Sequence, residues 1–130
     1  MQSVFLRIIN GEIPSYKVAE DSKHLAFLDI APLSKGHVLV VPKQQTDYLF
    51  DLEDDKYIDL WRFTKKVSTA IKKVIPCERI GVAVIGFEVP HAHIHLVPIN
   101  KLGDINFSNK RLNLSDQDFS EISQLISQAF

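Results

Sequence analysis

Apolar positions along this chain of 130 residues recur with two different periods, and these periods predict its helices and strands. A period of about 3.6 residues over residues 54–75 predicts one long helix, which Pro76 ends. Short stretches that are rich in β-branched residues and bounded by turn residues predict five strands. These strands are expected at residues 16–20, 25–30, 37–41, 79–85 and 91–99. The buried stripe of the long helix is expected to consist of Tyr57, Leu60, Trp61, Thr64, Val67, Ser68, Ile71 and Val74.

Two further helices are expected, one near each end of the chain. Residues 5–9 predict one or two helical turns, which Asn10-Gly11 ends because both residues accept the left-handed conformation of a helix terminus. Residues 115–129 predict a final amphipathic helix with Ser115 as its N-cap. The length is typical of one domain, so we expect residues 1–130 to form a single one. Strands mixed with one long central helix predict the α+β class, with a mainly antiparallel sheet.

Composition and charge exclude several classes of protein. Hydrophobic residues make up 45% of the chain and charged residues 24%, so the chain can bury a core without disulfides. A formal net charge of −1, with lysines spread along the chain, argues against a broad nucleic-acid-binding face. No apolar run approaches the roughly 18 residues of a membrane span, and no secretory apolar core is present near Met1. With Cys77 as the single cysteine, these features are typical of a cytoplasmic protein.

The chemistry of the sequence is concentrated in His91, His93 and His95. Three of the five histidines occur here at a strict spacing of two. Because successive side chains of a strand point to opposite faces, a strand over residues 91–99 would place all three rings on one face. Burying three imidazoles as plain core would require hydrogen-bond partners for each ring, so the pattern favours a functional site.

Two kinds of chemistry fit three neighbouring imidazoles. They could hold a catalytic zinc ion that keeps an open coordination position. Alternatively, one neutral imidazole could attack phosphorus, because its pKa lies close to neutral pH. The flanking imidazoles would then stabilise charge on the phosphoryl oxygens and protonate the leaving group. The residues alone leave both interpretations open.

The segment His91-Ala-His-Ile-His-Leu-Val-Pro98 resembles the signature of the histidine triad (HIT) family, in which histidines alternate with apolar residues. Residues 5–14, 25–32 and 36–43 resemble the segments that precede the triad in this family, in the same order. The resemblance extends over residues 4–99 and leaves residues 100–130 as a C-terminal extension. It implies an α+β fold with a five-stranded antiparallel sheet, which usually pairs into a homodimer. It also favours phosphorus chemistry over a metal site.

The resemblance implies a role for each histidine near the triad. His93 occupies the position of the family nucleophile and would form a nucleotidyl-histidine intermediate that water resolves. His91 and His95 would take the supporting roles, and His37 would also face the phosphate. The most similar branch of the family hydrolyses nucleoside phosphoramidates. We therefore expect a purine nucleotide-binding hydrolase that acts on such a substrate without a cofactor, with a dinucleoside polyphosphate hydrolase or a binding module of little turnover as alternatives.

The resemblance also implies a nucleoside site. Asp29 matches the acid that accepts hydrogen bonds from both ribose hydroxyls, which a carboxylate is able to do. The apolar positions around the base correspond to Phe5, Ile8, Phe27 and Ile30, with Val4 as a further candidate. A plain core is an equally good interpretation of these apolar residues, because a purine slot and a core have similar composition.

Several positions depart from the family pattern. Ser3 and Leu6 replace the Cys-x-x-Cys that contributes to a structural zinc site in many members, and Gln45 replaces a histidine ligand. The replacements at the two cysteine positions are not competent zinc ligands, so we predict no structural zinc. The loop before the triad is short, and Val84 stands where the family has an amide that reaches the phosphate or leaving group. Because valine cannot donate, we expect one phosphate contact to be missing.

Glu88 is a further departure, because the family usually has Ser or Thr at this position near the phosphate. A glutamate about 4 Å from a phosphate charge would cost about 4 kcal/mol at an effective dielectric constant of about 20. We hypothesise that Glu88 lies near the leaving group and favours a cationic amine over a second nucleotide. A glutamate that points outward into solvent is the alternative.

Overall fold

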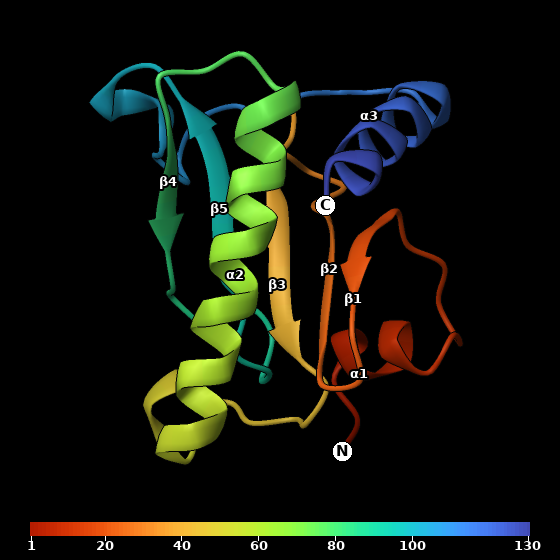
Figure 1. Ribbon diagram of the computed structural model, residues 1–130, viewed down its shortest axis with the longest axis vertical. Coiled ribbons are helices and arrows are strands. Elements are labelled where there is room, and N and C mark those ends of the chain that lie inside the picture. The colour runs from red at the N-terminus through yellow and green to blue at the C-terminus, as the bar shows by residue number, and fades with distance from the viewer.

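The computed structural model describes residues 1–130 and contains one antiparallel sheet of five strands with three α-helices (Figure 1). The strands are β1 (Lys17–Glu20), β2 (His24–Leu28), β3 (Val38–Pro42), β4 (Arg79–Ala83) and β5 (Ile94–Ile99). The helices are α1 (Val4–Ile9), α2 (Asp54–Val74) and α3 (Asp116–Ala129), with short 3-10 helices at Leu49–Asp51 and Leu102–Asp104. The predicted α+β class is confirmed, and every element except β5 begins and ends within two residues of its predicted position.

The sheet has the strand order β1-β2-β3-β5-β4, and all neighbouring strands pair antiparallel. The helix α2 connects β3 to β4, which lies at one edge of the sheet, and β5 then returns between them (Figure 1). In the ladder between β3 and β5, Leu39 lies opposite His95 and Val38 lies opposite Leu96. The other edge of the sheet is β1, which α3 packs against.

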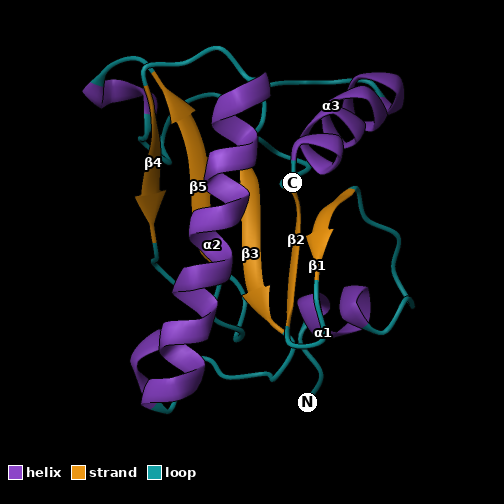
Figure 2. Ribbon diagram, in the orientation of Figure 1, coloured by secondary structure: helices purple, strands orange, loops and turns teal.

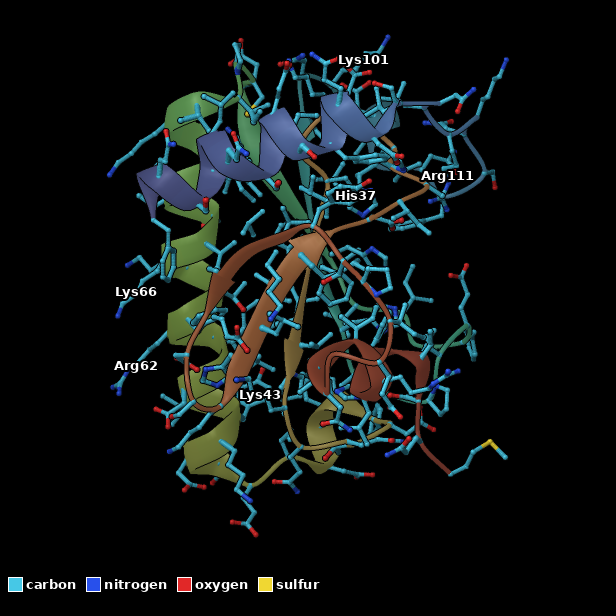
Figure 3. All side chains as sticks on the ribbon, turned by 90° about the vertical axis from the view of Figure 1, so that its right-hand side faces the viewer. His37, Lys43, Arg62, Lys66, Lys101 and Arg111 are labelled. Carbon is cyan, nitrogen blue, oxygen red and sulfur yellow. The ribbon has the colours of Figure 1, made fainter.

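The two faces of the sheet carry different layers. The long helix α2 and the terminal helix α3 cover one face and enclose the main core, which includes Val38, Val40, Ile94, Leu96, Leu60, Ile71 and Ile126. The short helix α1 covers part of the opposite face with a smaller apolar cluster of Phe5, Ile8, Leu25, Phe27, Leu39 and Val41. Strand alternation explains the division, because neighbouring residues of one strand point to opposite faces. Figure 3 shows α2 and α1 on opposite sides of the sheet.

The long helix α2 has the sequence features that stabilise a helix. Asp54 and Asp55 lie in its first turn and Lys72 and Lys73 in its last, which complements the helix dipole. The helix ends one residue earlier than predicted, at Val74, because the residue before a proline is disfavoured in helical conformation. Its buried residues are Leu60, Phe63, Thr64, Val67, Ala70 and Ile71. The predicted stripe was therefore wrong in part: Phe63 is buried, whereas Trp61 is only partly buried.

The predicted strand over residues 91–99 was also wrong at its start, because β5 begins at Ile94. The reason lies in Pro42, which would be the partner of Ala92 if the ladder with β3 continued. Proline has no backbone N–H to donate, so the ladder stops before this pair. The Ala92 N–H donates instead to the Thr46 carbonyl, over 2.6 Å.

None of the helices combines the length and the apolar character that crossing a membrane requires. Between β5 and α3 the chain is irregular except for the short turn at Leu102–Asp104 (Figure 2). The final helix α3 begins as predicted, because Ser115 caps it by accepting a hydrogen bond from the Asp118 backbone N–H.

Candidate active site

The structure brings His37, His91, His93 and His95 together on the face of the sheet that α1 covers. Their side chains come from the residue before β3, from the segment before β5 and from β5 itself. The ring centroids of His93 and His95 are 5.0 Å apart, and those of His37 and His95 are 5.2 Å apart. All four residues are buried, and His93 is 4% exposed. The four histidines that the sequence analysis selected therefore form one cluster.

The backbone fixes the proton of His93. Its Nδ1 lies 2.8 Å from the His91 carbonyl oxygen. A carbonyl can only accept, so Nδ1 carries the proton and Nε2 keeps its lone pair when the ring is neutral. The Phe5 ring packs edge-on against the imidazole, with the centroids 5.0 Å apart. A neutral imidazole with a free Nε2 lone pair in a fixed orientation has the properties of a nucleophile.

His37 and His95 form a hydrogen-bonded pair with defined tautomers. The Leu33 backbone N–H donates to His37 Nδ1 over 3.0 Å, so the proton of neutral His37 lies on Nε2. His37 Nε2 then donates to His95 Nδ1 over 3.0 Å, which leaves the proton of His95 on its own Nε2. Asp29 Oδ2 lies 3.6 Å from His37 Nε2. The pair therefore orients His95 so that its Nε2–H is a donor for a ligand.

Burial keeps these histidines neutral at pH 7. It lowers the pKa of His37 to about 3 and that of His95 to about 4. Neighbouring positive charge acts in the same direction, from His95 and Arg111 on the pKa of His37, and from His93 and Arg111 on that of His95. Burial also lowers the pKa of His91. Neutral rings are the condition under which the tautomers above hold.

Both ring nitrogens of His91 are occupied by the protein itself. Its Nε2 donates to the Pro42 carbonyl over 2.7 Å, and its Nδ1 accepts from the Ser3 hydroxyl over 2.7 Å. Ser3 Oγ in turn accepts from the Leu6 backbone N–H over 2.9 Å as the N-cap of α1. The Ser3 backbone N–H donates to Gln45 Oε1 over 2.9 Å. Ser3 therefore connects Gln45 and His91 through hydrogen bonds, and Ser3 and Gln45 are two of the positions at which the sequence departs from the family zinc pattern.

The zinc alternative for the triad is not favoured by this geometry. His91 has no lone pair left for a metal, since one nitrogen donates and the other accepts a hydrogen bond. A second group, Asp29 with His37 and His95, has ligand atoms within 4.8 Å of one another. Here too the Nε2 of neutral His37 carries a proton, which it donates to His95. The arrangement is that of a hydrogen-bonded relay.

Asp29 follows β2 and lies beside the relay. Its Oδ1 accepts a hydrogen bond from the Ala31 backbone N–H over 2.8 Å. Burial raises the pKa of this carboxyl, although the Ala31 hydrogen bond and the charge of Arg111 lower it. The negative charge of Glu88 raises the pKa of this carboxyl further.

The predicted base-site residues divide into two groups. Phe5, Ile8 and Phe27 are buried in the small apolar cluster under α1. Val4 and Ile30 lie at the surface, with exposed fractions of 41% and 75%. Val4 and Ile30 are therefore the members of this set that are open to a ligand in this structure, whereas Phe5, Ile8 and Phe27 belong to a core cluster.

Val84 and Glu88 lie in the exposed loop between β4 and the triad. A cavity of about 480 Å³ adjoins His93 and is lined by this loop, by the 3-10 turn after β3 and by α2. Its lining includes Val84, Phe87, Trp61 and Tyr48, so it is mainly apolar. This cavity lies outside the residues that the sequence analysis selected for the nucleoside.

The sequence analysis missed two residues beside the histidines: Phe107, which contacts His95, and Arg111, which contacts Phe107. The Phe107 ring centroid lies 4.7 Å from that of His95, and the Arg111 guanidinium carbon lies 5.5 Å from the Phe107 centroid. Both residues belong to the irregular segment between β5 and α3. The only local signal was an aromatic and a basic residue four positions apart, which does not by itself indicate a site.

An α+β fold with four buried, hydrogen-bonded histidines clustered at one face of its sheet has the features of a histidine-triad protein. Residues 10–102 match the HIT domain, and the chain belongs to this family. It is 39% identical to an uncharacterised HIT-like protein of Borreliella burgdorferi over 95% of each chain. It is 40% identical to an adenosine 5'-monophosphoramidase of Schizosaccharomyces pombe over 75% of this chain and 74% of the relative.

Solved structures of the family have the same fold. A HIT-like protein from Bartonella henselae superposes with a TM-score of 0.85 at 28% identity, covering 99% of this chain and 96% of the other. A zinc-bound histidine triad family protein from Mycobacterium smegmatis superposes with a TM-score of 0.79 at 29% identity, covering 97% and 91%. The predicted HIT-like fold is therefore confirmed.

We expect the free energy of unfolding to fall as the pH is lowered from 6.5 towards 4. The pKa values of His37 and His95 in the folded state, about 3 and about 4, lie below the ordinary 6.5, so the unfolded chain binds more protons in this interval. Each of these two histidines then lowers the free energy of unfolding by about 1.4 kcal/mol per pH unit once the pH is well below 6.5. Urea unfolding followed by Trp61 fluorescence between pH 4.5 and 7.5 measures the slope. The slope should be smaller in His37→Asn, and equal slopes would contradict the assignment.

Proposed function

We propose that this protein hydrolyses a purine nucleoside phosphoramidate, or a related nucleotidyl substrate, through a covalent intermediate on His93. The observation that carries the proposal is the hydrogen bond from His93 Nδ1 to the His91 carbonyl, which leaves the Nε2 lone pair free. In the first step Nε2 forms a bond to phosphorus while the phosphorus–nitrogen bond to the leaving amine breaks, and the amine takes up a proton from solvent. Water then attacks phosphorus and gives up a proton to solvent, the bond between phosphorus and His93 Nε2 breaks, and a nucleoside monophosphate is released.

The other residues of the site have supporting roles in this proposal. His95 Nε2–H would donate to a phosphoryl oxygen, where negative charge develops in the transition state. His37 would hold His95 in the tautomer that makes this donation possible. Asp29 would accept hydrogen bonds from the ribose hydroxyls, with Oδ2 as the oxygen not engaged by the Ala31 N–H. The His91 ring would be held by its hydrogen bonds to Ser3 and Pro42, which keeps the His91 carbonyl in place as the acceptor for His93 Nδ1.

Relatives support the substrate class. The Schizosaccharomyces pombe relative and two further relatives from Candida albicans and Saccharomyces cerevisiae are named adenosine 5'-monophosphoramidases. The exposed loop before the triad favours a second candidate, a nucleotide-binding module with little turnover, because Val84 offers no donor for the phosphate. A dinucleoside polyphosphate hydrolase would use the same histidines on a larger leaving group.

Incubation with an adenosine phosphoramidate distinguishes the enzyme from the binding module. We expect release of AMP, and a fall of more than about 1,000-fold in kcat for His93→Ala, because the nucleophile is removed. Rapid quenching followed by intact-protein mass spectrometry should detect the nucleotidyl adduct in the wild type. His24→Gln is the matched control, since this buried histidine packs on Phe63 away from the site. AMP binding without turnover would instead support the module.

We also propose that Glu88 favours a cationic leaving group. Two observations support this role: its side chain is exposed in the loop before the triad, and its negative charge raises the pKa of Asp29. Glu88→Ser should raise kcat/KM for a dinucleoside polyphosphate relative to that for an aminoalkyl phosphoramidate. We expect the ratio of these two kcat/KM values to change about tenfold, because the variant removes a charge interaction that solvent partly screens. Glu88→Gln, which removes only the charge, should reproduce the change, and an unchanged ratio in both variants would contradict this role.

We infer that the protein forms a homodimer through the edge strand β4. This strand pairs only with β5, so its other edge has unpaired backbone groups. Val82, Val84 and Ile85 are exposed on or next to it, with exposed fractions of 49%, 37% and 51%.

Sedimentation equilibrium should therefore give the mass of two chains. Val82→Lys should shift the equilibrium towards the monomer, because a charge would be buried in the interface. The control is Leu125→Lys, which places the same charge on α3, where Leu125 is 45% exposed. A monomeric wild type, or equal masses for both variants, would refute this interface.

A further inference from the structure

Part of the segment between β5 and α3, residues 103–115, follows the stretch that matches the HIT domain, and it contacts the histidine cluster through Phe107. Two hydrogen bonds fix this segment on the turn that follows Asp29. The Leu112 backbone N–H donates to the Pro32 carbonyl over 2.9 Å, and Arg111 Nη1 donates to the Ala31 carbonyl over 2.6 Å. Figure 3 shows Arg111 at the same end of the molecule as His37. The segment therefore has a defined position beside the site.

Phe107 is the side chain through which this segment reaches the relay. Its ring centroid lies 4.7 Å from that of His95 and 6.3 Å from that of His37, both in edge-to-face geometry. The Arg111 guanidinium carbon lies 5.5 Å from the centroid of the same ring, within the range of a cation–π contact. An aromatic ring in this place restricts rotation of the His95 ring and keeps water from the hydrogen bond between His37 and His95.

We propose that Phe107 is a positioning residue that holds the His95 ring in its orientation, and that Arg111 keeps Phe107 in place. This inference rests on the proposed function, because the orientation matters for donation from His95 Nε2 to a phosphoryl oxygen. The charged or titratable groups around the pair are Asp29, His37, His93 and Arg111, with Glu88 acting on Asp29. Arg111 is the permanent cation among them, so it also opposes protonation of the relay.

Phe107→Ala tests this role, with Phe107→Leu as the conservative rescue and Phe130→Ala as the matched control. Phe130 contacts Phe63 of α2, on the face of the sheet that the histidines do not occupy. With an adenosine phosphoramidate at pH 7, Phe107→Ala should lower kcat on the order of tenfold to a hundredfold while KM changes less than about threefold. Phe107→Leu should recover most of kcat, and Phe130→Ala should match the wild type.

The double variant tests the link between the two residues. Arg111→Met leaves the Phe107 side chain intact and should lower kcat in the same direction. The double variant should have the same kcat as Phe107→Ala alone, because both changes remove the same support of the His95 ring. If the loss of kcat in the double variant equals the product of the two single losses, the role given to Arg111 is contradicted.

Histidine titration by NMR without substrate gives a readout that does not depend on turnover. In Phe107→Ala the pKa of His95 should rise from about 4 towards 6.5, since water then reaches the ring. If the wild type releases no AMP but this titration shifts, the proposed function fails and the positioning role stands. Unchanged kcat together with an unchanged His95 titration in Phe107→Ala would overturn the positioning role.

Discussion

The site depends on the register between β3 and β5. Leu39 lies opposite His95 in this ladder, so His37, two residues before Leu39, lies on the same face and diagonally across from His95. A slip of one residue would turn His95 towards α2 and bring an apolar neighbour into its place. The register is held by residues that are fully buried against the helices on the other face: Val38, Val40, Ile94 and Leu96. The core that stabilises the fold therefore also sets the contact between the two histidines.

Most of the fold could be predicted because its signals are local. The period of α2, the β-branched strands and the Ser115 cap each lie within one short stretch of sequence. The start of β5 could not be predicted in this way, because Pro42, which limits the ladder, belongs to another strand. The buried side of α2 was predicted only in part for a related reason. Apolar residues occur on adjoining sides of this helix, and only the position of the sheet decides that Phe63 is buried more deeply than Trp61.

Some residues of the candidate site could likewise be predicted from local sequence, and others could not. The spacing of His91, His93 and His95 is visible in the sequence, and the resemblance to HIT proteins added His37 and Asp29. Ser3 was considered only as a poor zinc ligand, whereas in the fold it donates to His91, 88 residues away. Phe107 and Arg111 carry no motif at all. Their relation to the histidines arises from the path of the chain after β5, which no local pattern specifies.

That path has a consequence for how the protein acquires its site. The segment after β5 places Phe107 on the histidine face, whereas Phe119, twelve residues later, stacks on Tyr16 on the opposite face, with centroids 5.1 Å apart. On the ribosome, residues 91–95 emerge before the segment that carries Phe107, and α3 emerges later still. A nascent chain that has already paired its strands would therefore expose imidazoles that are free to bind protons or metal ions. The hydrogen-bonded pair of His37 and His95 is covered only when the segment that carries Phe107 settles on the turn after Asp29.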